Sequence, residues 1–459
     1  MSGDFDDDDA GAAPRRDADG LIDRRARPVR AGAFTPDVRG RHLSRPPEAR
    51  HEEFVGLADA IALDVVVDEI VRVREIKPAT FFGGGQVEEL ARLVKDQALE
   101  LLLVDTALTP IQQRNLERDT GAKVLDRTAL ILEIFGERAA TREGVLQVEL
   151  AHLNYQKSRL VRSWTHLERQ RGGFGFLGGP GETQIESDRR QLQDRIALLE
   201  ERLEKVRRTR QLQRGPRAAV PFPMVALVGY TNAGKSSLFN ALTGAAVQAE
   251  DLLFATLDTT VRRVGLPHGR DVVLSDTVGF ISELPTDLVA AFRGTLEEVV
   301  DAEIVLHARD VSNPDHAAQA QDVLSVLADL GVSGETRPVI EVWNKIDLLP
   351  RTEEGGPDLS GITPAGPVFA TVPVSAVTGE GLDTLLATIE AALAQGAKTY
   401  SVLVPHEKST DTGWLYEHTE VLSRGEPDEA GTRYSVRVLP RHRPEFLVRF
   451  AGRIEGADG

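Results

Sequence analysis

Eight residues with the pattern Gly229-x-x-x-x-Gly234-Lys235-Ser236 have the types and spacing to hold the phosphates of a nucleotide. Glycines let the backbone curl so that N–H groups point at an anion, and the start of a following helix strengthens that attraction. Lys235 would place its charge between the β- and γ-phosphates, and the Ser236 hydroxyl would bind Mg²⁺. The predicted phosphate-binding residues are Gly229, Tyr230, Thr231, Asn232, Ala233, Gly234, Lys235, Ser236 and Ser237.

A second motif, Asp276-Thr277-Val278-Gly279, follows the apolar stretch DVVLSD. At the end of a strand, Asp276 can reach Mg²⁺ through water, and the N–H of Gly279 can approach the γ-phosphate. Some GTPases carry a Gln directly after this motif that positions the attacking water. Phe280 stands there and cannot orient water. We therefore expect slow hydrolysis until a group from elsewhere, or a partner, completes the site.

The motif Asn344-Lys345-Ile346-Asp347 indicates which base is bound. Guanine presents two donors, N1–H and its exocyclic amine, and one carboxylate accepts both, whereas adenine offers no such pair. The charge-assisted pair from Asp347 should contribute about 1–3 kcal/mol. The later loop Ser375-Ala376-Val377 can contact guanine O6. Together, the three motifs predict a GTPase that binds GTP and GDP, uses Mg²⁺ and releases phosphate.

A GTPase also needs a switch threonine that binds Mg²⁺ and senses the γ-phosphate. The segment LLFATLDTT lies between the first two motifs and contains three candidates, Thr256, Thr259 and Thr260. Residue types alone do not choose among them.

Another glycine pattern, G-x-G-x-x-G at Gly173, Gly175 and Gly178, is typical of dinucleotide-binding loops only when a strand precedes it. Here two long helical segments flank it, and each has apolar residues at heptad-like spacing. They are Leu146, Leu150, Leu153, Leu160, Trp164 and Leu167 in the first, and Leu192, Ile196, Leu199, Leu203 and Val206 in the second. The pattern predicts an antiparallel hairpin with this loop at its tip.

The predicted tip has the composition of an RNA-binding surface. Arg171, Arg189 and Arg190 could contact phosphates, and Phe174 and Phe176 could stack on unpaired bases. A simple flexible turn is the alternative. The whole chain has a net charge of −17, which argues against DNA as a partner and requires any RNA contact to be local.

The alternation of strand-like and helix-like runs predicts an α/β protein. We expect a disordered tail over residues 1–50, an α/β domain over 51–140, the hairpin over 141–215, a parallel-sheet G domain over 216–398 and a small α+β domain over 399–459. The 459 residues contain no cysteine, no secretory leader and no run of eighteen apolar residues. We therefore expect a cytoplasmic monomer without integral membrane segments, and we leave peripheral membrane association open.

The segment GGPGETQIESDRR, at residues 178–190, resembles the signature of the HflX family of translational GTPases, and LLFATLD and DTVGFI resemble further motifs of that family. The resemblance implies a Ras-like doubly wound G domain. It makes Thr256 the switch threonine and Mg²⁺ ligand, within the nucleotide-binding segment Phe254, Ala255, Thr256, Leu257 and Asp258. It also implies binding to the large (50S) ribosomal subunit near the peptidyl-transferase region, stimulation of the GTPase by the ribosome, and separation of stalled ribosomes under stress.

Other GTPase classes fit less well. A tRNA-modifying GTPase would need a C-terminal cysteine motif, and an Era-like protein would need a KH domain after the G domain. The remaining alternative is a GTP-gated RNA- or protein-binding regulator in which hydrolysis is incidental.

Overall fold

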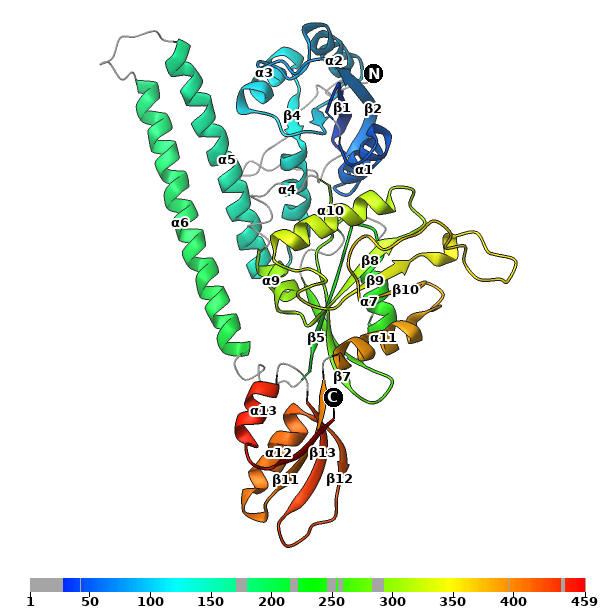
Figure 1. Cartoon of the computed structure of the whole chain (residues 1–459). Helices are drawn as coiled ribbons and strands as arrows, with labels where there is room; N and C mark the ends of the chain where they lie inside the picture. Colours follow the sequence, from blue (N-terminus) through cyan, green and yellow to red (C-terminus); the bar gives the residue numbers. More distant parts are fainter. Residues whose placement is uncertain are drawn as a thin grey trace, which may run out of the picture. The chain divides into compact units, whose positions relative to one another are not determined.

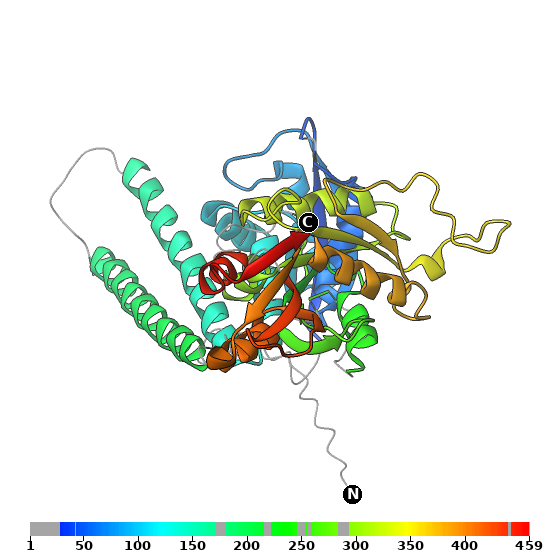
Figure 2. The same ribbon diagram turned by 60° about the horizontal axis from the view of Figure 1, so that its bottom comes forward.

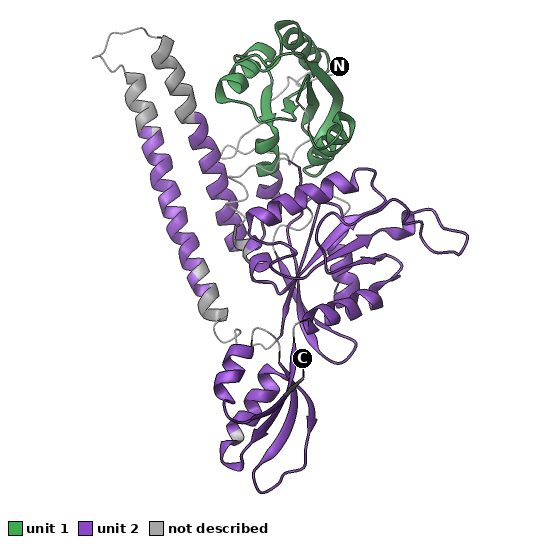
Figure 3. Cartoon of the chain, viewed as in Figure 1, with its two compact units in different colours: residues 1–133 green, residues 134–459 purple. Residues whose placement is uncertain are grey.

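The computed structural model describes residues 28–41, 43–170, 180–214, 222–245, 253–254, 259–282, 293–395, 397–438 and 442–458. The chain divides into two compact units, residues 1–133 and 134–459 (Figure 3). Within the described residues, no helix combines the length and apolar character needed to cross a bilayer.

The first unit, coloured blue to cyan in Figure 1, contains a four-stranded parallel sheet. The order of its strands is β2-β1-β3-β4. Its elements in chain order are β1 Arg30–Val38, α1 Pro47–Asp59, β2 Asp64–Val73, α2 Gly84–Asp96, β3 Leu101–Val104, α3 Pro110–Thr120, β4 Lys123–Asp126 and α4 Arg127–Arg138, of which α4 continues into the second unit. On one side of the sheet, α2 contributes Val87, Leu90 and Val94 to the core.

The predicted tail over residues 1–50 is wrong from Arg30 onward, and residues 1–27 and 42 lie outside the described part. β1 is an inner strand that pairs in parallel with both β2 and β3. Its small residues gave no strand-like apolar pattern in the sequence, but they fit a strand that is closely packed on both sides. A Cβ at Gly32 would lie 2.8 Å from the Phe34 ring. By contrast, β2 is a half-exposed edge strand.

The second unit begins with the helical hairpin of α5 Arg142–Gln170 and α6 Pro180–Arg214. The two helices lie side by side in both views (Figures 1 and 2). Arg195 of α6 forms an ion pair with Glu149 of α5 at 2.6 Å. The seam between them contains Leu146, Leu150, Leu153, Leu192, Ile196, Leu199, Leu203 and Val206. The hairpin prediction is correct here. The tip at residues 171–179, and the side chains of Leu160, Trp164 and Leu167, lie outside the described part.

A six-stranded sheet follows, in the order β10-β9-β8-β5-β7-β6. Its elements are β5 Met224–Gly229, α7 Lys235–Thr243, β6 Thr260–Gly265, β7 Asp271–Asp276, α9 Arg293–Asp301, β8 Ile304–Asp310, α10 His316–Asp329, β9 Val339–Asn344, the 3-10 turn η1 Ile346–Leu348, β10 Ala370–Pro373 and α11 Leu382–Ala394. This is the expected doubly wound G-domain fold, with the buried residues of β5, β8 and β9 at its centre.

One edge of this sheet departs from the prediction of a wholly parallel arrangement. β6 pairs antiparallel with β7. The connection is a tight turn closed by the hydrogen bond from Leu266 N to Arg270 O, with Gly269 at a φ of +83°. The turn returns the chain directly beside β6, so no crossover helix is needed.

The chain ends in an antiparallel sheet in the order β12-β13-β11-β14 with helices against it. The elements are β11 Lys398–Val404, η2 His406–Lys408, α12 Ser409–His418, β12 Glu420–Arg424, β13 Thr432–Val438, α13 Arg443–Arg449 and β14 Ile454–Asp458. Its core includes Trp414, Tyr434 and Phe446. This agrees with the expected small α+β domain, while the boundaries 216–398 and 399–459 remain predictions.

Candidate functional site

The loop between β5 and α7 has a backbone that only glycine can adopt at two positions. Gly229 has a φ of +157°, and a Cβ there would lie 2.3 Å from the carbonyl oxygen of Ala308. Gly234 has a φ of +82°, and its Cβ would lie 2.2 Å from Nδ2 of Asn344. The loop then enters α7, whose first N–H groups have no partner within the helix. Backbone N–H groups at such a turn and helix start are donors that can hold an anion.

Lys235 is the first residue of α7 and is 6% exposed. Its Nζ donates to the carbonyl oxygen of Tyr230 at 2.8 Å. Burial lowers the pKa of Lys235 to about 8, although the nearby carboxylate of Asp276 opposes the change. An anion beside Nζ would restore the stability of the charged form, which suits a phosphate ligand.

Ser236 and Asp276 form a pair of oxygen ligands next to this lysine. Ser236 Oγ donates to Asp276 Oδ2 at 2.8 Å, and the Asp276 side chain is fully buried at the end of β7. A hydroxyl and a carboxylate in contact fit the hard oxygen donors that Mg²⁺ prefers. Among the described residues, no group of three His, Asp or Glu side chains forms a metal cage. Mg²⁺ bound to a nucleotide does not require one, because phosphate and water complete its shell.

The segment after β7 lies directly against the phosphate loop. Thr231 N donates to Phe280 O at 2.7 Å, and Phe280 N donates to Gly229 O at 3.1 Å. A Cβ at Gly279 would lie 2.8 Å from Thr231 Cγ2 and 3.0 Å from Lys235 Nζ. Glycine is therefore required for this close approach. The Phe280 side chain is buried, which agrees with the absence of a water-orienting group at that position.

Asn344 joins the phosphate loop to the later loop predicted to contact guanine. Its Nδ2 donates to Ala233 O at 2.9 Å, and its Oδ1 accepts from Ala376 N at 3.2 Å. Lys345 pairs with Asp310 at 2.7 Å, and Asp347 is half-buried in η1. Asn344 thus has a positioning role that the motif alone did not reveal.

The loop of residues 375–377 has a buried residue at one end and an exposed residue at the other. Ser375 is fully buried and its Oγ accepts from Thr378 N at 3.1 Å, while Val377 is 84% exposed. The carboxyl ends of β5, β7, β9 and β10 lie at one edge of the sheet, so the three motifs converge there.

The switch segment is described only at its ends. Phe254 is 1% exposed and packs edge-to-face on Phe135 of α4, with ring centroids 4.8 Å apart. Thr259 donates to the buried Glu298 at 3.2 Å, and Thr260 begins β6. Ala255, Thr256, Leu257 and Asp258 lie outside the described residues.

Two groups that contact the motifs were missed by the sequence reasoning. Glu298 of α9 is 1% exposed and accepts from both Ser275 and Thr259. Ser282 contacts the side chain of Tyr230. Neither residue belongs to a motif of fixed spacing. The one sequence signal for Glu298 is its place among the apolar residues of α9, which could have indicated a buried carboxylate.

Of the predicted RNA-contacting residues, Arg189 and Arg190 are exposed on α6. Arg171, Phe174 and Phe176 lie outside the described residues.

Four family models match consecutive parts of the chain. They are described as GTP-binding GTPase N-terminal (residues 48–136), GTP-binding GTPase Middle Region (138–217), 50S ribosome-binding GTPase (224–345) and HflX C-terminal domain (365–455). A GTPase HflX from Magnetococcus marinus is 50% identical over 404 residues, which cover 88% of this chain and 90% of the relative. The chain belongs to the HflX family of GTPases. It therefore binds GTP and hydrolyses it.

Other HflX proteins are similarly related. That of Caldanaerobacter subterraneus is 45% identical, covering 83% of this chain and 85% of the relative. That of Escherichia coli is 40% identical, covering 84% and 88%. An HflX GTPase must hold a triphosphate and a guanine at one place, and the ends of parallel strands in a doubly wound sheet are where such ligands bind.

Proposed function

We propose that this HflX GTPase acts on the large ribosomal subunit and separates stalled ribosomes in the cytoplasm, using GTP bound at the carboxyl edge of β5, β7 and β9. The observation that carries the proposal is the long hairpin of α5 and α6. Arg189 and Arg190 lie exposed on α6, close in sequence to the glycine-rich connection. Exposed arginines give salt-dependent affinity for RNA phosphates even in an acidic chain. The family model named 50S ribosome-binding GTPase supports the same partner.

In the proposed site, each group has one task. Gly229–Ser237 surround the phosphates, the Lys235 ammonium compensates charge between the β- and γ-phosphates, and the Gly279 N–H meets the γ-phosphate. Asp347 accepts the two guanine donors, and residues 375–377 approach O6. Phe254–Asp258 complete the nucleotide site.

The Ser236 and Thr256 hydroxyls would hold Mg²⁺, with Asp276 reaching it through water. The bound Mg²⁺ supplies charge neutralisation at the phosphate oxygens. This chain's contribution is to position the carboxylate and the hydroxyl, which already contact each other at the end of β7.

The buried Phe280 explains why we expect a partner to be needed. In this position it can exclude water but cannot orient it, so the attacking water must be positioned by another group. We propose that binding to the large subunit supplies that group or arranges it.

The test is GTP turnover and splitting of intact ribosomes, with and without purified large subunits. We expect large subunits to stimulate turnover, and we expect GTP-dependent co-sedimentation and splitting by the native chain. Lys235→Ala should lose all of these. Rapid turnover, at tens per second without ribosomes, would contradict the role given to Phe280. If large subunits neither stimulate nor bind the protein, the regulator with incidental hydrolysis becomes the better explanation.

A further inference from the structure

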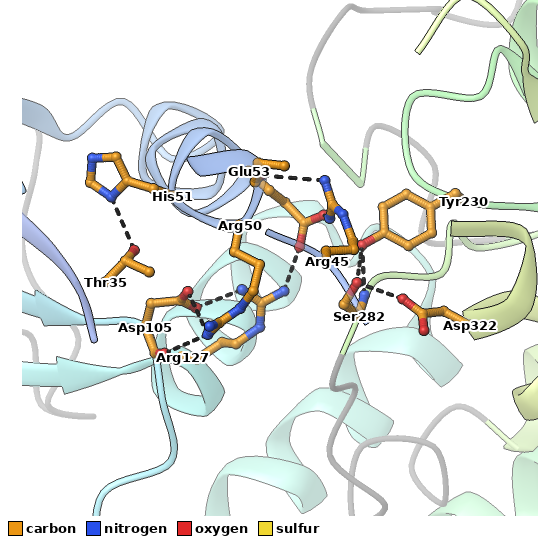
Figure 4. A network of polar contacts seen from close by, with 11 residues as sticks. Thr35, Arg45, Arg50, His51, Glu53, Asp105, Arg127, Tyr230, Ser282 and Asp322 are labelled. Carbon is orange, nitrogen blue, oxygen red and sulfur yellow. Dashed lines mark hydrogen bonds and ion pairs between the residues drawn. The ribbon is translucent and has the colours of Figure 1, made fainter. Parts of the chain in front are cut away.

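The side chain of Tyr230, the second residue of the phosphate loop, reaches the segment that follows Gly279 (Figure 4). Its hydroxyl accepts a hydrogen bond from Ser282 N at 2.7 Å and lies 2.7 Å from Ser282 Oγ. Ser282 Oγ also bonds to Asp322 Oδ2 of α10 at 2.7 Å. Tyr230 and Ser282 are 4% and 6% exposed. The contact is therefore a buried one in which a lost partner is costly.

The same two segments also meet through their backbones. Tyr230 and Phe280 form a parallel bridge, and Gly279 lies between Thr231 and the Lys235 ammonium. Residues 279–282 are therefore held against the phosphate loop by two contacts, the backbone bridge at Phe280 and the hydrogen bond of Ser282 to the Tyr230 hydroxyl. Ser282 is where this docked segment meets α10.

We propose that Tyr230 and Ser282 form a latch that holds Gly279 beside the phosphate loop and thereby sets the preference of the protein for GTP over GDP. Asp322 anchors the latch to α10. These are positioning residues, because they act through Gly279. The inference rests on the proposed contact between Gly279 and the γ-phosphate.

The thermodynamic reason is differential binding. GTP has a γ-phosphate that favours the docked segment, whereas GDP has no group at Gly279 and is indifferent to it. A ligand shifts a conformational equilibrium only by its difference in affinity for the two states. Weakening the latch must therefore weaken GTP binding and leave GDP binding almost unchanged.

The test is Tyr230→Phe in the full chain, without ribosomes. The variant keeps the ring and the backbone of residue 230, and the phosphate loop would bind phosphate through that backbone. It leaves the Ser282 N–H without the Tyr230 hydroxyl as acceptor and removes the contact of that hydroxyl with Ser282 Oγ. We expect the Kd of a non-hydrolysable GTP analogue to rise about tenfold, or about 1.4 kcal/mol, while the GDP Kd changes by less than about twofold. Ser282→Ala loses the contacts of Ser282 Oγ with the Tyr230 hydroxyl and with Asp322, but it retains the backbone N–H that donates to that hydroxyl. It should therefore change the ratio in the same direction by less.

Tyr416→Phe is the matched control, since that tyrosine is 57% exposed and belongs to α12 of the C-terminal domain. It should leave both constants unchanged. Equal weakening of GTP analogue and GDP by Tyr230→Phe would show a merely structural role and overturn the latch. Should Tyr230→Phe fail to fold, an unchanged affinity ratio in Ser282→Ala would overturn it instead. A Lys235→Ala protein with normal affinity for both nucleotides would contradict the proposed phosphate site itself.

Discussion

At the scale of single residues, the predicted phosphate loop contains groups that lower the stability of the folded chain when no ligand is bound. The Lys235 ammonium is buried, and its pKa is lowered to about 8 mainly by loss of hydration. Gly229, Gly234 and Gly279 allow backbone approaches that any side chain would block. These features suit an anionic ligand such as phosphate, and we expect them to reduce stability when no anion is bound.

The first prediction concerns pH. Because the pKa of Lys235 is lower in the folded chain than its usual value of 10.5, the unfolded chain binds more protons between about pH 8 and 10.5. This group's contribution to stability therefore rises with pH across that window. Without nucleotide, Lys235→Met should be more stable than the native chain at pH 7 by about 1–3 kcal/mol, and the gap should close toward pH 10.5. Urea unfolding at a series of pH values measures it. A gap independent of pH would refute the buried-charge explanation.

The second prediction concerns the buried ion network of the first unit. Arg127 donates to Asp105 at 2.7 Å and also contacts Glu53, and Arg50 pairs with Asp105 at 3.1 Å (Figure 4). Burial alone would lower the pKa of Arg127, but the Asp105 and Glu53 carboxylates raise it above its usual value.

Asp105→Asn should therefore destabilise the first unit by about 3–5 kcal/mol, because two buried arginines lose a charged partner. Hydrogen exchange at the amides of β1 and β3 gives the measurement. The exposed Asp96→Asn at the end of α2 is the control, and a similar effect from both would contradict the prediction.

At the scale of elements, the hairpin shows that local apolar spacing can predict both a helix and its packing. The seam residues of α5 and α6 repeat at helical spacing, so each helix acquires one apolar face and the shortest connection brings the two faces together. β1 shows the opposite case. Its residues carry little local signal, and pairing on both edges is what buries them.

The third prediction uses two adjacent leucines of α6. Leu199 is 2% exposed and belongs to the seam, whereas Leu198 is 45% exposed. Leu199→Ala should destabilise the hairpin by about 2–4 kcal/mol through the cavity that it leaves. Leu198→Ala should have an effect within about 0.5 kcal/mol. Hydrogen exchange at the amides of α5 is the readout. Equal effects of the two substitutions would mean that the seam does not hold the helices together.

At the scale of the whole molecule, charge is distributed unevenly. The net charge is −17, yet Arg189 and Arg190 are exposed on α6 and are close in sequence to the predicted RNA-probing tip. Such a chain should bind RNA through a small number of phosphates, and net charge should keep it away from nucleic acid elsewhere.

The fourth prediction follows from that distribution. Arg189→Gln with Arg190→Gln should reduce the slope of log affinity for large subunits against log salt by about 1–2, because about one counterion is released per phosphate contact. Arg202→Gln with Arg208→Gln, farther along the same helix, removes equal charge and should leave the slope unchanged. Sedimentation with large subunits over a range of potassium chloride concentrations provides the measurement. Loss of slope in the control alone would place the RNA contact elsewhere.

Sequence reasoning located the nucleotide motifs and the hairpin, because each depends on spacing within one loop or one helix. The alternation of strand-like and helix-like runs predicted a parallel sheet, and the resemblance to the HflX family implied its doubly wound class. The P-loop needs only a strand, a turn and a helix start in immediate succession, and the seam needs only a repeat along each helix. It missed the N-terminal inner strand and the antiparallel edge at β6, where pairing with distant residues overrides weak local preference.

By itself, the sequence determined that three motifs occur in order along one chain, and it predicted that they bind phosphate, sense the γ-phosphate and select guanine. Only the tertiary structure decided how they are held. Three hydrogen bonds join residues that are far apart in sequence. Asn344 bonds to Ala233, 111 residues away, Tyr230 to Ser282, 52 residues away, and Glu298 to Thr259, 39 residues away. Such contacts carry no periodic signal, because partners far apart in sequence become neighbours only when parallel strands bring their carboxyl ends to one edge of the sheet.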